Sequence, residues 1–400
     1  MLVLLPLSSA TAQSTGSVEG SAVLSGQECL PAAGSTVLVG ETQTVVADDG
    51  TFGVSGLAPD EYDVTVSPPS AYETATASVD VEAGETSQIE LALSPATLRA
   101  ERVAGLTRVD TAVAASQRAF PSGAPAVVIA TARAYPDALV AAPLAVRLGG
   151  PLLLVEKRSG ETVLDEVRRL GAREAVIIGA ISGVTAVVQA ELLAEGLDVR
   201  RIAGESRFDT AALVARELGP SPDAEVALTT GTDFADALSF AAFAAVRGIP
   251  ILLTPTDDLP AETVEAIAAI GADHTIVLGG VEAISNEVAS AVPSPERIAG
   301  NDRYSTSVAI ARMARDRGAD LSTVYVATGT NWPDALAAGP VAAGTQGPLL
   351  LVGGFAAKDF LIEVFDEVEE LVAFGGPAAL SREVLAATAQ PAGPEERACG

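Results

Sequence analysis

The chain has few of the side chains that most often bind metals or carry out catalysis. Its 400 residues include one histidine, two cysteines and two lysines. So small a set of histidines and cysteines cannot supply the four nitrogen and sulfur ligands of a usual zinc site. The sequence also contains no Gly-x-Ser-x-Gly, His-Glu-x-x-His or Ser-x-x-Lys motif of the kind that many hydrolases use. We therefore expect no catalytic residue, no metal ion and no cofactor.

Basic residues are also scarce, and they are unevenly distributed. Lysine and arginine total 24 against 52 aspartates and glutamates, which gives a formal net charge of −28 at pH 7. Binding to nucleic acid needs a concentrated basic face, so we expect no nucleic-acid partner. Residues 13–98 hold thirteen acidic residues and no basic one, so every lysine, arginine and histidine follows them. Two such different compositions predict two kinds of domain.

The beginning of the chain is apolar and predicts export. Residues 1–7 form a short apolar run, and Ala10-Thr11-Ala12 follows with the small side chains of a cleavage site. This pattern predicts a signal peptide over residues 1–12, although a basic beginning is missing and the alternative is an irregular apolar terminus. No later segment has the ~18 to 20 apolar residues of a membrane span, so we expect no integral membrane span. In an exported chain, Cys29 and Cys399 can pair only if the fold brings them together.

Residues 13–96 show the two-residue alternation of β-strands. Apolar and polar side chains alternate in several short runs that turn residues separate, which predicts an all-β sandwich. Three segments, Asp49–Phe52, Gly56–Pro59 and Tyr62–Val66, resemble the carboxypeptidase regulatory-like family. In that family an Asp-Gly turn precedes a Leu-Pro corner and a tyrosine-bearing strand. The resemblance implies a spacer or adhesive unit.

The rest of the chain repeats one pattern three times. Each copy opens with Arg-aliphatic-Ala-Gly, and a second arginine follows six residues after the first. Further on stands an aspartate before Ala-Leu, and fourteen residues later a proline begins a triplet of aliphatic residues. These motif residues are Arg102, Arg108, Asp137 and Pro151 in copy one, Arg201, Arg207, Asp236, Pro250, Ile251, Leu252 and Leu253 in copy two, and Arg297, Arg303, Asp334 and Pro348 in copy three. We place the copies at residues 99–198, 199–294 and 295–392, with a C-terminal tail at 393–400.

Within each copy, short aliphatic runs alternate with segments of helical spacing. In copy two the spacing predicts helices over residues 209–218, 235–246 and 260–270, and strands over residues 225–230, 251–254 and 275–278. Strands that alternate with helices of this length pair in parallel through right-handed crossovers. Continuous aliphatic strands further indicate a sheet covered on both faces. Each copy is therefore predicted to be a compact open α/β domain.

The repeated motifs resemble the cell-wall-binding repeat type 2 family, whose three tandem modules carry R-I-A-G-x-x-R-Y-x-T-A, P-D-A-L, P-I-L-L and V-x-x-L-G-G. The resemblance spans about residues 100 to 390. It implies Toprim-like modules, packed as a pseudo-trimer within one monomeric chain, and noncovalent attachment to an anionic secondary polymer of a Gram-positive-type cell wall. Some positions depart from the pattern, because Ala235 replaces the helix-starting proline and Ala180 replaces the second glycine.

The motif residues allow two kinds of role. Pro136 and Pro333 suit a first helical position, and the aspartate that follows each complements the positive helix end. Because an aspartate there opposes a bound anion, we favour its pairing with a motif arginine, within a module or across a module boundary. The alternative is that the arginines bind the polymer directly as bidentate donors. For the proline-aliphatic triplets we favour buried central strands over polymer contact, and for His274 a structural role over that of a general base.

Together these features predict a secreted, non-catalytic surface protein that binds an anionic cell-wall polymer. Three weak sites on one chain gain strength when the polymer repeats, because the second and third contacts are intramolecular. The acidic β domain would project outward. The alternatives are a protein associated with a cell-wall hydrolase and a structural surface protein of the S-layer kind.

Overall fold

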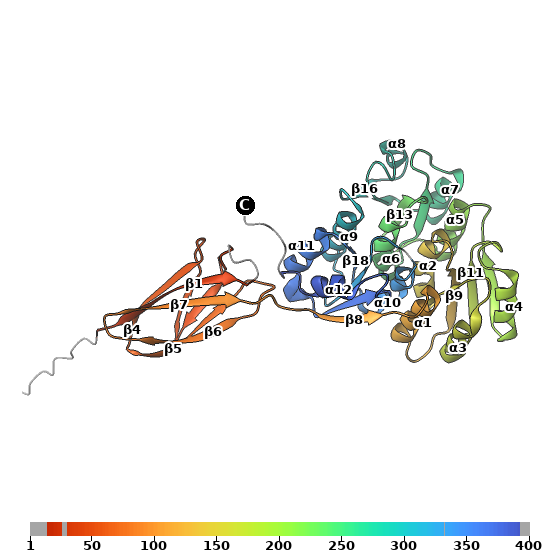
Figure 1. Ribbon diagram of the computed structural model, residues 1–400. Coiled ribbons are helices and arrows are strands. Elements are labelled where there is room, and N and C mark those ends of the chain that lie inside the picture. Colours follow the sequence, from red (N-terminus) through yellow and green to blue (C-terminus); the bar gives the residue numbers. More distant parts are fainter. Residues whose placement is uncertain (1–13, 26–29, 332, 393–400) are drawn as a thin grey trace, which may run out of the picture. The chain divides into compact units, whose positions relative to one another are not determined.

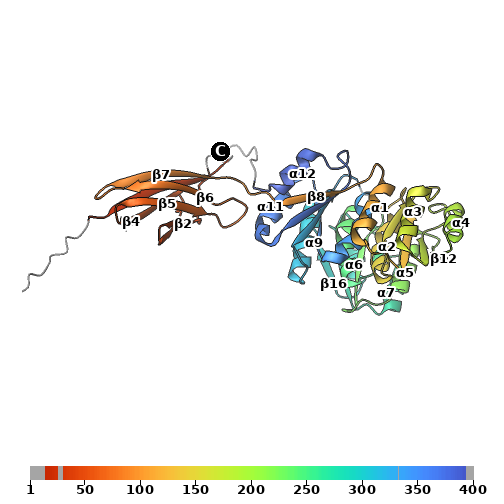
Figure 2. The ribbon, with the colours of Figure 1, turned by 90° about the horizontal axis from the view of Figure 1, so that it is seen from below.

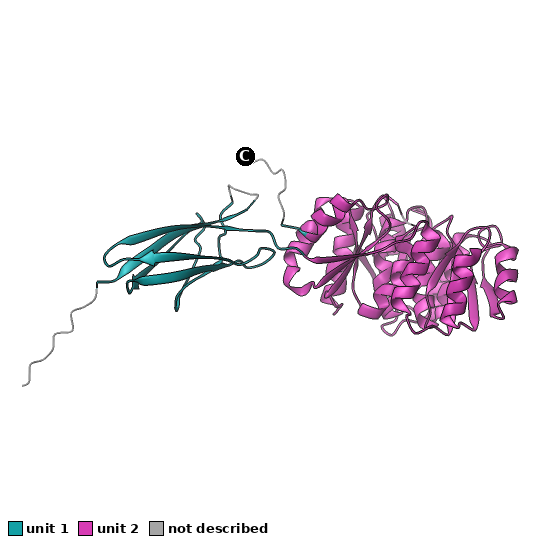
Figure 3. Cartoon of the chain, turned by 60° about the horizontal axis from the view of Figure 1, so that its bottom comes forward, with its two compact units in different colours: residues 1–97, 390–400 teal, residues 98–389 magenta. Residues whose placement is uncertain are grey.

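The computed structural model describes residues 14–25, 30–331 and 333–392, and it divides into two compact units (Figures 1 and 3). Unit 1 contains residues 1–97 and 390–400, and unit 2 contains residues 98–389. The predicted signal peptide, both cysteines and the predicted tail lie outside the described residues. Within the described ranges, no helix is long and apolar enough to cross a membrane.

Unit 1 contains two β-sheets, and its described residues include no helix. Its strands are β1 (Gly16–Leu24), β2 (Thr36–Val39), β3 (Thr42–Val45), β4 (Thr51–Leu57), β5 (Asp60–Ser67), β6 (Ala75–Val81) and β7 (Thr86–Leu93). One sheet has the order β4-β1-β7 and the other the order β3-β2-β5-β6. Val18 of the first sheet and Val64 of the second are both fully buried in one shared core. The alternating apolar residues therefore point inward from both sheets, as the two-residue pattern predicts.

Unit 2 contains three four-stranded sheets whose strands all run in parallel. The first sheet consists of β10 (Leu152–Val155), β9 (Ala126–Thr131), β11 (Glu174–Ile178) and β12 (Asp198–Ile202), in that order. The second consists of β14 (Ile251–Thr254), β13 (Glu225–Thr230), β15 (His274–Leu278) and β16 (Pro295–Ile298). The third consists of β18 (Leu349–Val352), β17 (Thr323–Thr328), β19 (Glu370–Phe374) and β8 (Arg99–Val103).

Helices connect these strands and cover the sheets. Around the first sheet lie α1 (Arg108–Ala119), α2 (Pro136–Arg147), α3 (Gly160–Leu170) and α4 (Ala186–Ala194). Around the second lie α5 (Arg207–Leu218), α6 (Ala235–Arg247), α7 (Ala261–Ile270) and α8 (Asn286–Ser290). Around the third lie α9 (Arg303–Asp316), η1 (Ala335–Ala337), α10 (Ala338–Thr345), α11 (Phe355–Glu363), η2 (Phe365–Glu367) and α12 (Arg382–Ala389). We call each sheet with its helices a lobe, numbered 1 to 3 in this order.

The last strand of each sheet carries the opening arginine of the next sequence repeat. Thus β12 in lobe 1 contains Arg201, and β16 in lobe 2 contains Arg297. The third sheet has no following repeat and is completed by β8, where Val103 pairs with Phe374. Figure 2 shows β8 beside α12 of lobe 3, although its chain continues into α1 of lobe 1. The three lobes are therefore linked into a closed ring.

The equivalent helices α2, α6 and α10 contact one another at the centre of this ring (Figure 1). Their contact is made by small residues, Ala142, Ala241 and Gly339, each five positions after the motif aspartate. A Cβ atom at Gly339 would lie 2.7 Å from the Cβ atom of Ala142 and 3.4 Å from the carbonyl oxygen of Ala241. Such close packing leaves no room for a larger side chain at the centre.

The proline-aliphatic triplets form β10, β14 and β18, which lie at the edges of their sheets. Our expectation of a central strand was therefore wrong, although the expected burial is found. In the second lobe Ile251, Leu252 and Leu253 are at most 2% exposed. The edge strand is buried because its own lobe supplies α5 and the neighbouring lobe supplies α2, both in contact with β14. Covering an edge in this way also prevents pairing with another chain.

Candidate functional site

Three clefts lie at the carboxyl ends of the parallel strands, each between two neighbouring lobes. Cleft 1, between lobes 1 and 2, has a volume of about 460 Å³; cleft 2, between lobes 2 and 3, about 520 Å³; and cleft 3, between lobes 3 and 1, about 450 Å³. Open parallel sheets bind their ligands at this end of the strands. The position and the threefold repetition make these clefts the candidate site.

The second arginine of each repeat forms part of a cleft wall. Its Nη1 atom donates a hydrogen bond to a carbonyl oxygen just beyond the first strand of its own lobe. The bonds are Arg108 to Ala132 at 2.9 Å, Arg207 to Gly231 at 2.5 Å and Arg303 to Gly329 at 2.8 Å. Each guanidinium is thus held by main chain on one side while it lines the cleft.

The first arginine of each repeat has a structural role at the end of a sheet. Its Nη1 atom donates to the carbonyl oxygen of the glycine that follows the neighbouring strand. The bonds are Arg102 to Gly375 at 2.5 Å, Arg201 to Gly179 at 2.6 Å and Arg297 to Gly279 at 2.7 Å. Burial lowers the pKa of all three guanidinium groups, and they are absent from the cleft walls.

The motif aspartates line the clefts near the beginning of the central helices. Asp137 is in the first turn of α2 after Pro136, as predicted. In lobe 3 the prediction was wrong, because Pro333 and Asp334 lie in a turn, and Asp334 occupies the N-cap position of the short 3-10 helix η1 without a capping hydrogen bond. A glycine with positive φ lies against each carboxylate, for example Gly179 at +99° beside Asp137. A Cβ atom at this glycine would overlap the carboxylate oxygen, so the glycine is what makes room for the aspartate.

The motif arginine and the motif aspartate of each cleft come from different lobes, and in clefts 1 and 2 the arginine acts on the pKa of the aspartate. Burial raises the pKa of Asp137, and the charge of Arg207 opposes the shift. Burial likewise raises the pKa of Asp236 to about 6; the nearby Asp233 adds to the shift and Arg303 opposes it. Among the described residues, no ion pair within 4.0 Å joins a motif aspartate to a motif arginine. The predicted ion pairing is therefore not found in the described part of the chain, and in clefts 1 and 2 the arginine acts on the aspartate only as a nearby charge.

The proline-aliphatic triplets do not reach the clefts. The carbonyl oxygen of each proline accepts a hydrogen bond of 2.9 Å from the neighbouring strand, and the aliphatic side chains that follow it fill the cores. These bonds come from Val128 to Pro151, Ala227 to Pro250 and Tyr325 to Pro348. The triplets thus form buried edge strands and line none of the three clefts.

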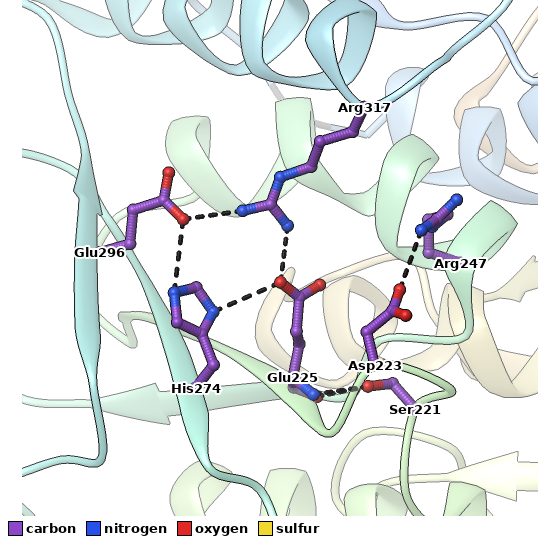
Figure 4. A network of polar contacts seen from close by, with 7 residues as sticks. All are labelled: Ser221, Asp223, Glu225, Arg247, His274, Glu296 and Arg317. Carbon is purple, nitrogen blue, oxygen red and sulfur yellow. Dashed lines mark hydrogen bonds and ion pairs between the residues drawn. The ribbon is translucent and has the colours of Figure 1, made fainter.

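His274 lies at the opposite, amino end of the strands (Figure 4). Its Nδ1 atom is 3.3 Å from a carboxylate oxygen of Glu225, and its Nε2 atom is 3.4 Å from one of Glu296. Arg317 of lobe 3 binds the same two carboxylates at 2.6 and 2.7 Å. The histidine therefore belongs to an ion-pair network that joins lobes 2 and 3, which agrees with the structural role that we favoured.

The clefts also contain charged residues that the repeated motifs do not include. Arg133 lines cleft 1, whereas Asp233 and Glu282 line cleft 2. They stand in loops next to the motifs, at positions where the three repeats differ. Because these residues do not recur, a search for repeated residues does not find them. Only the fold shows that they lie beside motif residues in the clefts.

The comparison with known families identifies the repeats. Residues 102–192, 201–289 and 297–385 match the profile of a family described as Cell wall binding domain 2 (CWB2). These three segments contain all six motif arginines and cover most of the chain. The prediction of three tandem cell-wall-binding repeats is thereby confirmed.

Two relatives from Bacillus subtilis (strain 168) each match somewhat less than two thirds of the chain. N-acetylmuramoyl-L-alanine amidase LytC is 34% identical over 256 residues, which are 64% of this chain and 50% of that protein. Amidase enhancer is 28% identical over 257 residues, 63% of this chain and 34% of that protein. The chain thus spans half the length of the first relative and about a third of the second.

Two solved structures share the fold. Cwp6 from Clostridium difficile has a TM-score of 0.68 at 20% identity and covers 95% of this chain and 68% of that chain. Cwp8 from the same organism has a TM-score of 0.65 at 21% identity and covers 92% of this chain and 68% of that chain. The likeness confirms the predicted α/β fold with repeated modules.

Proposed function

Because the chain belongs to the family of proteins with cell wall binding domain 2, we propose that unit 2 anchors an exported surface protein to an anionic secondary polymer of the cell wall. The attachment is noncovalent, and the three clefts make it. The observation that carries this proposal is the repetition of one cleft, with an arginine in its wall, around a single closed ring. A repeating polymer can meet several such clefts at once and gain avidity.

The acidic character of the chain is compatible with an anionic ligand. At physiological ionic strength, charges separated by more than about 8 Å are largely screened, so the residues within a cleft decide its affinity. Each cleft places Arg108, Arg207 or Arg303 beside the first turn of the helix that the arginine begins. Main-chain N–H groups and the helix dipole at such a turn favour anions.

Within this proposal, the sequence repeats at residues 99–198, 199–294 and 295–392 are Toprim-like modules, and the first strand of each repeat completes the sheet of a neighbouring lobe. Residues 13–96 form a carboxypeptidase regulatory-like β-sandwich that serves as a spacer or adhesive unit, after a signal peptide at residues 1–12. The whole chain is a secreted monomer that carries no catalytic centre. Two sheets around one core in unit 1 and three parallel sheets in unit 2 support this division.

Sedimentation with purified cell-wall sacculi tests the proposed anchoring. The full chain is mixed with untreated sacculi and with sacculi from which acid has removed the secondary polymer, and the bound fraction is measured. We expect binding to the untreated sacculi and its loss after removal of the polymer. Equal binding to the bare peptidoglycan would contradict the proposal, because the polymer would then not be the ligand.

A second candidate is a role beside a cell-wall hydrolase, which the similarity to an amidase and to an amidase enhancer favours. In this role the chain either assists such an enzyme or cuts the wall itself. Release of soluble muropeptides from sacculi distinguishes the two functions. We expect no release by the chain alone, and steady release would favour the hydrolase over the anchor.

A further inference from the structure

The three clefts differ in charge at two loop positions. These positions lie between the first strand of each lobe and its central helix, directly before the aromatic residue of the aspartate motif. The pairs are Arg133-Ala134 in lobe 1, Thr232-Asp233 in lobe 2 and Thr330-Asn331 in lobe 3. The loop thus adds a positive charge to cleft 1, a negative charge to cleft 2 and no charge to cleft 3.

In cleft 2 the motif arginine, Arg303, already has a carboxylate partner. The Nη2 atom of Arg303 lies 3.3 Å from the Oδ2 atom of Asp233. Its guanidinium carbon also lies 5.4 Å from the centre of the Phe234 ring, so the group is held on two sides. The wall of cleft 2 contains three further carboxylates, those of Asp236, Glu282 and Asp302. An anionic ligand would meet more negative than positive charge there.

Cleft 1 has an even balance of charge, with two arginines and two carboxylates in its wall. Ala134 stands where cleft 2 has Asp233, so Arg207 has no carboxylate at that position. Arg133 adds a second guanidinium; its side chain is exposed and forms no ion pair within the described ranges. Ser182 also replaces the glutamate of cleft 2. Only Asp137 and Glu205 oppose the two arginines in this wall.

Cleft 3 lies between these extremes. Its wall contains one arginine, Arg108, and two carboxylates, Asp334 and Glu156. At the position equivalent to Asp233, lobe 3 has Asn331, which adds no charge. At the position equivalent to Glu282 it has Ala378. The electrostatic preference for an anion therefore falls from cleft 1 to cleft 3 to cleft 2.

We propose that cleft 1 is the principal binding site for the anionic groups of the wall polymer, and that Arg133 and Arg207 bind those groups together. The inference deepens the proposed function and rests on it. Phosphate and carboxylate share the chemistry that two guanidinium groups recognise, namely two or more oxygens with a negative charge. Clefts 3 and 2 then add weaker contacts to the same polymer chain.

Arg133→Ala tests this assignment, with Arg147→Ala as the matched control. Arg147 is the last residue of α2 in lobe 1; it is exposed and forms no ion pair among the described residues. Its replacement by alanine changes the net charge by the same amount as Arg133→Ala. Binding of the full chain to a glycerol phosphate polymer, to a polyuronate and to untreated sacculi is measured by calorimetry or sedimentation. We expect Arg133→Ala to weaken binding about tenfold and Arg147→Ala to leave it unchanged. Tighter binding of the glycerol phosphate polymer would identify phosphate as the anion, and tighter binding of the polyuronate would identify carboxylate.

The double variant Thr232→Arg, Asp233→Ala gives the converse test, because it places the residues of cleft 1 in cleft 2. We expect it to bind several-fold more tightly than the unaltered chain, with a steeper dependence on salt. Equal losses from Arg133→Ala and Arg147→Ala, or an unchanged double variant, would overturn the assignment to cleft 1. If the unaltered chain bound neither polymer nor sacculi, the proposed function itself would fail.

Discussion

In unit 2, the edge of the ring at the amino ends of the strands (the amino edge) and the edge at their carboxyl ends (the carboxyl edge) differ in how the repeats use charged residues. At the amino edge, ion pairs between carboxylates and Arg118, Arg200 or Arg317 join neighbouring elements. Each lobe uses its own residues there. Glu101 pairs with Arg118 at 2.6 Å. In the second repeat, Arg200 stands at the position of Glu101 and Glu217 at that of Arg118, so this pair, at 2.9 Å, has its charges exchanged. At the carboxyl edge, the three repeats instead keep the same arginine and aspartate.

This difference separates the demands of folding from those of binding. A pair of opposite charges can hold two lobes together with either sign, so the amino edge tolerates different residues in each lobe. At the carboxyl edge, Asp137 and Asp236 are largely buried and form no ion pair with any other described residue; burial raises the pKa of each and costs stability. Two buried carboxylates with a raised pKa at the same position of neighbouring repeats favour a function at this edge.

Opening the centre of the ring should have the largest effect, because both edges depend on it. Gly339→Val would place two methyl groups against Ala142 and the main chain of Ala241. We expect the free energy of unfolding to fall by about 3 kcal/mol, measured by urea denaturation. Gly344→Ala in the same helix is the control, since its Cβ atom meets nothing within 4 Å, and it should leave stability unchanged or improve it. Similar losses from both variants would contradict the close central contact.

Removal of a cation from the amino edge should have the next largest effect. Arg317→Ala leaves the carboxylate of Glu225, whose side chain is 10% exposed, without its 2.6 Å partner. We expect a loss of about 2 kcal/mol in the free energy of unfolding. Arg216→Ala breaks the exposed pair with Glu265 and serves as the control, with a loss of at most about 0.5 kcal/mol. Equal losses would mean that the amino edge is not a specific junction.

At the carboxyl edge, substitution of an aspartate should stabilise the fold. The folded-state pKa of Asp236 is about 6, above its ordinary value of 3.8. Its protonated form therefore stabilises the fold below pH 4, and that contribution is lost as the pH rises through 6. We expect Asp236→Asn to raise the free energy of unfolding by about 1 to 2 kcal/mol at pH 7.5 and to leave it unchanged near pH 3.5. A loss of stability at pH 7.5 would show that the carboxylate is held by attraction and not strained by burial.

Local pattern predicted much of each lobe. The strand expected at residues 225–230 agrees with β13 (Glu225–Thr230), because a short run of β-branched and aliphatic residues favours a buried strand. The expected helices at residues 209–218 and 235–246 agree with α5 and α6 within two residues. In unit 1, the two-residue alternation predicted β-strands, although β3 with its exposed polar residues shows little of this pattern and β4 coincides with segments interpreted as a turn and a corner.

Pairing between repeats could not be predicted from the sequence of one repeat. The segment Pro295–Ile298 has a half-exposed, charged pattern and becomes β16 only because β15 offers it a ladder. In the same way, β8 is separated from its partner β19 by most of the chain. The clefts arise from this closure, since each needs residues of two lobes. Of the repeated motif residues, the second arginines and the aspartates line the clefts, whereas the positions of Arg133 and Asp233 in the clefts required the fold.

Hydrogen exchange measured by mass spectrometry, with and without the wall polymer, tests most directly whether the carboxyl edge is the binding surface. The account predicts slower exchange of the main-chain amides around the cleft loops, strongest at residues 131–137 and 203–208 of cleft 1. The amides near His274 and those of unit 1 should exchange as before. Protection confined to the amino edge or to unit 1, with the cleft loops unchanged, would contradict the account.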